Sequence, residues 1–95
     1  MCRNIRVLYN FKPPTTPEEI HAAALQYVRK VSGVNKPSAA DERAFERAIT
    51  QVTTATTRLL EALTARAPRR TREGEQAKAR ARWAQREARI ARARA

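Results

Sequence analysis

The stretch that decides the fold is TPEEIHAAALQYVRKVSG, residues 16–33. It begins with a helix-start signal, because Thr16 suits the N-cap, Pro17 the first helical position, and Glu19 completes a capping box. The apolar residues that follow recur at helical spacing and predict one buried stripe, made of Ile20, Ala24, Tyr27, Val28 and Val31. Gly33 predicts the end of the helix, since glycine favours the position just after a helix C-terminus.

A second and longer helix is predicted to begin at Ser38 and to end before Pro68. Its apolar face has heptad spacing, with Phe45, Val52 and Leu59 alternating with Ala48, Ala55 and Ala62, and with Ile49, Thr56 and Leu63 widening it. We expect the two helices to form an antiparallel hairpin. Because the first helix is shorter, it leaves part of this face uncovered, and we expect homodimerisation through Phe45, Val52 and Leu59.

The segment before the hairpin, residues 3–11, alternates in polarity and predicts an extended, half-buried arm. Its apolar side holds Ile5, Val7, Tyr9 and Phe11, with Leu8 as the exception. Pro13 and Pro14 end the extended segment. The expected fold class is therefore all-α: a short extended N-terminal arm, an antiparallel two-helix hairpin, and a basic C-terminal helix or partly disordered tail.

Positive charge is concentrated at the C-terminal end of the chain. Residues 69–95 contain ten Lys or Arg and three Glu, a formal charge of +7 out of +11 for the whole chain. We therefore divide the chain into an arm plus hairpin, residues 1–68, and a basic tail, residues 69–95. Within the tail we predict a helix from about Arg72 to Arg94. One side of it carries a basic stripe formed by Lys78, Arg82, Arg86, Arg89 and Arg92. The apolar residues Ala79, Trp83 and Ile90 lie beside this stripe.

Such a stripe indicates a polyanionic partner. Guanidinium groups bind phosphate in bidentate geometry, cationic side chains release counterions from nucleic acid, and an exposed tryptophan can stack on a base. The candidate nucleic-acid-binding residues are Lys78, Arg82, Trp83, Arg86, Arg89 and Arg92. The first hypothesis is a non-enzymatic protein that contacts the RNA or DNA phosphate backbone and needs no cofactor. Other interpretations are a solvated tail, a membrane-surface contact, or a protein-protein adaptor.

A rival hypothesis concerns Cys2 and His21, the only cysteine and the only histidine. Removal of Met1 would leave an α-amine and a thiol on one residue, a pair that can bind a metal or act as a nucleophile. Two such residues fall short of the four ligands of a structural zinc site. The alternative is that Cys2 packs as a small apolar residue and His21 lies on a helix flank.

The remaining composition favours no enzyme class. The chain has only two glycines, so a glycine-rich phosphate loop is not expected, and one histidine gives no basis for a Ser-His-Asp site. No apolar stretch is long enough to predict a membrane span. A single cysteine allows no intramolecular disulfide, which fits a reducing compartment. We expect a cytoplasmic protein.

Three segments resemble a small bacterial family catalogued only as a domain of unknown function, whose members begin Met-Cys-Arg-Asn-Ile. They are MCRNIR at residues 1–6, NFKPP at residues 10–14 and AAALQYVRKVSG at residues 22–33. The resemblance covers roughly residues 1–70, and the tail is similar only in being basic and alanine-rich. It implies a compact bacterial protein of the cytosol, and it brings no established activity.

Overall fold

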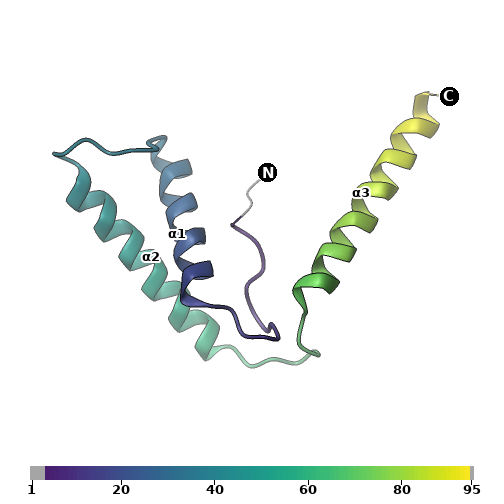
Figure 1. Ribbon diagram of the computed structural model, residues 1–95, viewed down its shortest axis with the longest axis horizontal. Helices are drawn as coiled ribbons and strands as arrows, with labels where there is room; N and C mark the ends of the chain where they lie inside the picture. The colour runs from purple at the N-terminus through teal and green to yellow at the C-terminus, as the bar shows by residue number, and fades with distance from the viewer. Residues whose placement is uncertain (1–3, 95) are drawn as a thin grey trace.

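The computed structural model describes residues 4–94, which form three helices: α1 (Pro17–Ser32), α2 (Glu42–Ala62) and α3 (Arg72–Arg94) (Figure 1). Within residues 4–94 no strand is present, and the only β-type pairing is an isolated bridge between Phe11 and Arg70. The predicted all-α class is confirmed. Helices α1 and α2 pack together, whereas α3 reaches α1 through the side chain of Arg72 in its first turn and then projects away from both helices.

The start and end of α1 follow from local hydrogen bonds. Oγ1 of Thr16 accepts from the backbone N–H of Glu19 at 3.2 Å, and Oε1 of Glu19 accepts from the backbone N–H of Thr16 at 2.9 Å. Gly33 has a φ of 72°, in the left-handed region that glycine enters without steric cost. Its N–H donates to the carbonyl oxygen of Arg29 at 2.9 Å. The capping box and the glycine C-cap are confirmed.

The buried stripe of α1 is narrower than predicted. Ile20, Ala24 and Val28 are buried, but Tyr27 is 49 % exposed and Val31 is 70 % exposed. The reason is that α1 packs against only one helix. A single neighbour covers the line of residues four apart, and side chains to either side of that line stay in contact with solvent.

Helix α2 is shorter than predicted at both ends, with 21 residues. Residues 38–41 form a turn in which the N–H of Asp41 donates to the carbonyl oxygen of Ser38 at 3.0 Å, so the helix begins only at Glu42. At the other end Leu63 takes an extended conformation, with φ −71° and ψ 144°. The chain from there to Pro68 continues outside the helix.

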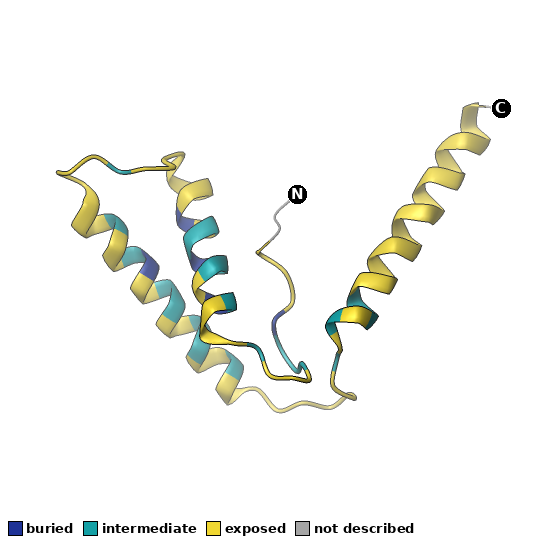
Figure 2. Ribbon diagram, viewed as in Figure 1, coloured by how far each residue is buried: buried dark blue, intermediate teal, exposed yellow. Residues whose placement is uncertain are grey.

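The core lies where α1 and α2 meet (Figure 2). Ala24, Val28 and Ile49 are buried there, and the partly buried residues packed against them are Leu25, Phe45, Ala48 and Val52. The prediction that Phe45, Val52 and Leu59 share one uncovered face is wrong. Phe45 and Val52 belong to the contact with α1, whereas Leu59 is 56 % exposed. In a straight α-helix, residues spaced seven apart rotate by about 20° per heptad around the helix axis. The line of contact with α1 therefore does not follow Phe45, Val52 and Leu59 along the whole of α2.

The N-terminal arm, residues 4–15, lies between α1 and α3 (Figure 1). Leu8 is its buried residue, while Ile5 and Val7 are 43 % and 54 % exposed. Of the predicted apolar side, Tyr9 and Phe11 are partly buried whereas Ile5 and Val7 are exposed, and the one buried residue of the arm is Leu8, which the prediction set apart from that side. The arm is not part of a sheet: its later residues pair with Arg70 through a single isolated bridge, and at its start Oε1 of Gln26 accepts from the N–H groups of Asn4 at 2.9 Å and Ile5 at 3.1 Å. Without a ladder no two-residue period is imposed.

Candidate functional site

Backbone hydrogen bonds join the arm to Arg70, just before α3, although the two segments are far apart in the sequence. The N–H of Arg70 donates to the carbonyl oxygen of Asn10 at 2.7 Å, and the N–H of Lys12 donates to the carbonyl oxygen of Arg70 at 2.8 Å. Asn10 has a φ of 63°, a left-handed conformation that asparagine tolerates. Its Nδ2 donates to the carbonyl oxygens of Ala67 and Pro68, both at 3.1 Å. We call this region, residues 8–19 with residues 67–75, the junction.

Arg72, in the first turn of α3, makes the main side-chain contacts of the junction. Its Nη1 donates to the carbonyl oxygen of Pro13 at 2.8 Å, and its Nη2 donates to Oε1 of Glu19 at 2.7 Å. The guanidinium carbon lies 5.3 Å from the centroid of the Phe11 ring, within cation–π range. These contacts fix the direction in which α3 leaves the hairpin.

Glu19 accepts from three segments of the chain. It completes the cap of α1, it binds Arg72, and its Oε2 lies 3.3 Å from Nη2 of Arg6 in the arm. The hydrogen bond from Arg72, followed by the one from the backbone N–H of Thr16, lowers the pKa of Glu19 from 4.5 to about 2. Glu19 is therefore ionised at neutral pH and holds both arginines.

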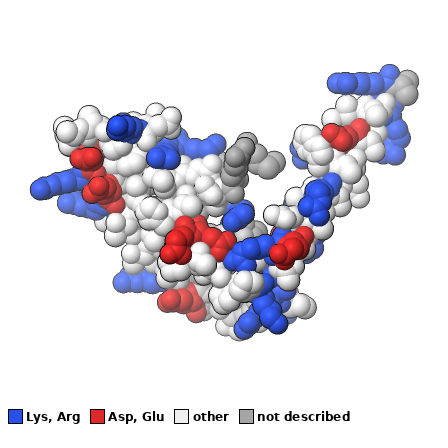
Figure 3. Space-filling model, in the orientation of Figure 1, with Lys and Arg blue, Asp and Glu red and all other residues white. Residues whose placement is uncertain are grey.

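The six residues predicted to bind nucleic acid all lie on α3 and are all exposed. Figure 3 shows Lys and Arg side chains along this helix. Lys78 is in an ion pair with Glu75, at 3.4 Å. The guanidinium carbon of Arg86 lies 5.9 Å from the centroid of the Trp83 ring, and Trp83 is 57 % exposed. Within residues 4–94, Arg82, Arg86, Arg89 and Arg92 have no carboxylate partner.

The two residues of the rival hypothesis are not brought together in the part of the chain that the structure describes. His21 is exposed on α1, and Cys2 lies outside the described residues. Among residues 4–94 no group of three His, Cys, Asp or Glu side chains is placed to hold a metal ion. None of the helices in this range combines the length and the apolar character needed to cross a bilayer.

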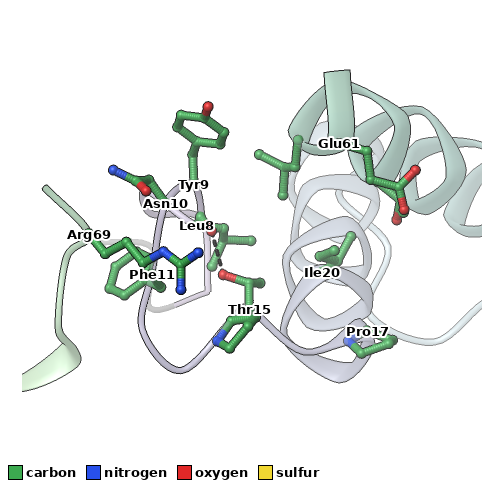
Figure 4. Close-up of a pocket in the computed structure, with 12 residues that line it drawn as sticks. Leu8, Tyr9, Asn10, Phe11, Thr15, Pro17, Ile20, Glu61 and Arg69 are labelled. Carbon is green, nitrogen blue, oxygen red and sulfur yellow. Dashed lines mark hydrogen bonds between the residues drawn. The ribbon is translucent and has the colours of Figure 1, made fainter. Parts of the chain in front are cut away.

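Two grooves of more than 400 Å³ lie beside the arm, and sequence reasoning found neither. The first, of about 440 Å³, lies between the arm and the C-terminal end of α2 (Figure 4). Leu8 and Ile20 line it together with Glu61 and Arg69, and the Thr15 hydroxyl donates to the carbonyl oxygen of Leu8 beside it. Both grooves depend on where the arm lies, and no local pattern in the sequence encodes that position.

The second groove, of about 430 Å³, lies between the arm and the first half of α3. The arm contributes Val7, Leu8 and Phe11 to its wall, and α3 contributes Gln76, Ala79 and Arg82. Arg6, Glu19, Arg72 and Glu75 complete the lining. We call it the arm–α3 groove. Of the residues predicted from the sequence to bind nucleic acid, only Arg82 borders it.

Comparison with known proteins places the chain in a family. The family model of an uncharacterised conserved protein, DUF2277, matches residues 1–78. The chain belongs to the DUF2277 family. The expected resemblance to a domain of unknown function is thus confirmed, and it extends further than residue 70. No curated protein and no solved structure is significantly similar to the chain.

The DUF2277 match ends inside α3, between the junction and the most basic part of the helix. It includes Arg70, Arg72 and Glu75, and it stops at Lys78, before Arg82 and Trp83. The junction therefore lies wholly within the part of the chain matched to the family. The exposed arginines beyond residue 78 are a feature of this chain that the match does not cover.

Proposed function

We propose that this protein is a non-enzymatic binding protein that contacts the phosphate backbone of RNA or DNA through α3. The observation that carries the proposal is that the arginines after residue 78 are exposed and have no carboxylate partner within residues 4–94. Residues 79–95 contain six arginines and one acidic residue, Glu87, a formal charge of +5. Every side chain from residue 79 to residue 94 is exposed, and none of these arginines has a carboxylate partner within residues 4–94.

Unpaired, exposed guanidinium groups are well suited to phosphate. Binding breaks no ion pair within the described residues, and each phosphate contact releases condensed counterions from the nucleic acid. The basic residues from Arg70 to Lys78 contrast with this part, because Arg70 and Lys78 are already paired with Glu75 and Arg72 with Glu19. The proposal therefore assigns the junction to structure and the following turns of α3 to binding.

The proposal extends to the oligomeric state and the location. Leu59 and Leu63 are 56 % and 47 % exposed at the C-terminal end of α2, and they are apolar surface that a second copy would cover. We include homodimerisation through this end of α2, in place of the face centred on Phe45. A nucleic-acid-binding role also agrees with the cytoplasmic location expected from the sequence.

The test is fluorescence anisotropy of labelled RNA and DNA oligonucleotides, titrated with full-length protein at stepped salt concentrations. We expect affinity to fall steeply with salt. Changing Arg82, Arg86 and Arg89 to Gln should lower the slope of log affinity against log salt by up to about three, one for each lost phosphate contact. Absence of binding at low ionic strength would show that α3 is only a solvated helix.

The same binding assay, applied to a Cys2→Ser variant, tests the rival hypothesis. Cys2→Ser should leave nucleic-acid affinity unchanged if α3 is the binding element. If instead Cys2→Ser abolishes whatever activity the protein shows and the three arginine changes do not, the thiol or metal hypothesis with Cys2 and His21 is favoured.

A further inference from the structure

A narrow line of apolar residues on α3 continues the wall of the arm–α3 groove. Ala79 lines the groove, and Trp83 and Ile90 follow it four and eleven residues later, which returns to the same side of an α-helix. Trp83 is 57 % exposed and Ile90 is 45 % exposed. The apolar part of the groove wall therefore continues outward along α3 through Trp83 and Ile90 as an apolar track.

The arginines that have no carboxylate partner within residues 4–94 run beside this track. Arg82, Arg86 and Arg89 lie on one flank of it by helical spacing, and Arg82 itself lines the groove. Arg86 leans over the Trp83 ring, with its guanidinium carbon 5.9 Å from the centroid. A row of cationic side chains thus lies next to a row of apolar ones that includes one aromatic ring, Trp83.

This pairing of rows distinguishes between the forms of nucleic acid. Proteins that bind single strands combine a positively charged groove along the backbone with aromatic side chains on which bases stack. A duplex offers its phosphates to the cationic row, but its bases are already stacked and paired, so an exposed Trp83 gains nothing from it. The groove volume of about 430 Å³ is typical of a site for one small molecule, so an unpaired base fits and a duplex does not.

We propose that the arm–α3 groove and the apolar track beyond it bind a single-stranded nucleic acid. Its bases lie against Val7, Trp83 and the wall of the groove, and its phosphates follow Arg82, Arg86 and Arg89. The inference rests on the proposed function, and adds to it a substrate class and a contribution from the arm. The formal charge of +5 in residues 79–95 favours a polyanion over an apolar protein segment as the occupant.

The first experiment compares labelled oligothymidylate with a mixed-sequence DNA duplex of the same length, using the full chain at one salt concentration. Trp83 is the only tryptophan, so its fluorescence reports on this site alone. We expect tighter binding of the single strand and quenching of Trp83 emission by it. Trp83→Ala should weaken single-strand binding by roughly 5- to 150-fold and change duplex binding little.

The second experiment tests the arm. Val7→Glu places a negative charge on the groove wall. Because the Val7 side chain is 54 % exposed, we expect the substitution to leave the fold intact. Val31→Glu is the matched control, because it makes the same change at a 70 % exposed valine on α1 that does not line the groove. We expect Val7→Glu to weaken single-strand binding roughly tenfold or more, and Val31→Glu to weaken it much less. Far-ultraviolet circular dichroism of both variants checks folding.

The outcomes separate this inference from the proposed function. Equal affinity for single strand and duplex, with unchanged Trp83 emission and equal effects of the two glutamates, would overturn the inference and leave phosphate binding by α3 standing. Absence of binding to either oligonucleotide at low salt would overturn both.

Discussion

Nη2 of Arg72 lies 2.7 Å from Oε1 of Glu19, so the first turn of α3 is bonded to the residue that caps the start of α1. The same carboxylate holds Arg6 of the arm at 3.3 Å. One acidic side chain therefore connects the arm, the hairpin and α3. Beyond this turn, α3 has no packing contact with the other helices, and its direction depends on the junction.

The Glu19 contacts predict a loss of stability in acid. The folded protein lowers the pKa of Glu19 from 4.5 to about 2, so its carboxylate stabilises the fold above pH 4.5, and this contribution is lost as pH falls through about 2. Glu19→Gln removes the dependence, so wild type should melt higher than the variant at neutral pH and approach it near pH 2. Thermal unfolding by circular dichroism measures this. Glu46→Gln, at an exposed position of α2 outside the described ion pairs, is the control.

Two truncations separate the junction from the binding segment. A chain that ends at residue 79 keeps Arg70 and Arg72, and it should melt close to the full-length protein while losing most nucleic-acid binding. A chain that ends at residue 68 loses the bonds from Arg70 to Asn10 and from Arg72 to Glu19, so it should melt at a lower temperature. Equal melting temperatures of the two truncated chains would show that the junction contributes no stability.

The small core predicts a sharp contrast along α2. Ile49 is 8 % exposed and packs with Ala24 and Val28, so Ile49→Ala should reduce the free energy of unfolding by about 2–5 kcal/mol. Leu59 is 56 % exposed in the single chain, so at protein concentrations low enough to keep the chain monomeric Leu59→Ala should change it by no more than about 0.5 kcal/mol. Urea unfolding followed at the helical circular dichroism band measures both under these conditions. A similar loss at the two positions in the monomer would place Leu59 in a buried contact within the chain.

The salt dependence of nucleic-acid binding should arise mainly from the arginines on one side of α3. Arg82 and Arg89 lie on the same side of the helix, whereas Arg80 and Arg94 lie on the other side, since each residue advances about 100° around the axis. Changing Arg82 and Arg89 to Gln should lower the salt slope of binding by up to about two. The same changes at Arg80 and Arg94 remove equal charge and should alter it much less. Equal effects of the two pairs would indicate diffuse attraction by the whole helix.

The exposed end of α2 predicts self-association. Sedimentation equilibrium over a range of protein concentrations should show a monomer–dimer equilibrium. Leu59→Glu combined with Leu63→Glu should shift it to monomer, because charge at an apolar contact costs affinity. Ile90→Glu is the control, as a 45 % exposed apolar residue on α3. A wild-type chain that stays monomeric at high micromolar concentration would exclude the dimer.

Local signals in the sequence were sufficient for α1 and α3. Thr16, Glu19 and Gly33 act within a few residues of themselves, so their capping roles follow directly from the order of the residues. The extent of α3 from Arg72 to Arg94 and its exposed basic stripe were predicted for the same reason. Helix periodicity and charge are visible without any knowledge of the neighbours.

The arm, the end of α2 and the two grooves were decided only by the tertiary structure. Leu8 is buried because of where the arm runs, and α2 ends at Ala62 while the carbonyl groups of Ala67 and Pro68 bond to Asn10. These contacts join residues more than fifty positions apart, and no local pattern records them. By itself the sequence determined which segments are helical and where positive charge lies on α3. Long-range hydrogen bonding of Arg70 and Arg72 determined how that helix is held and which of its faces borders a groove.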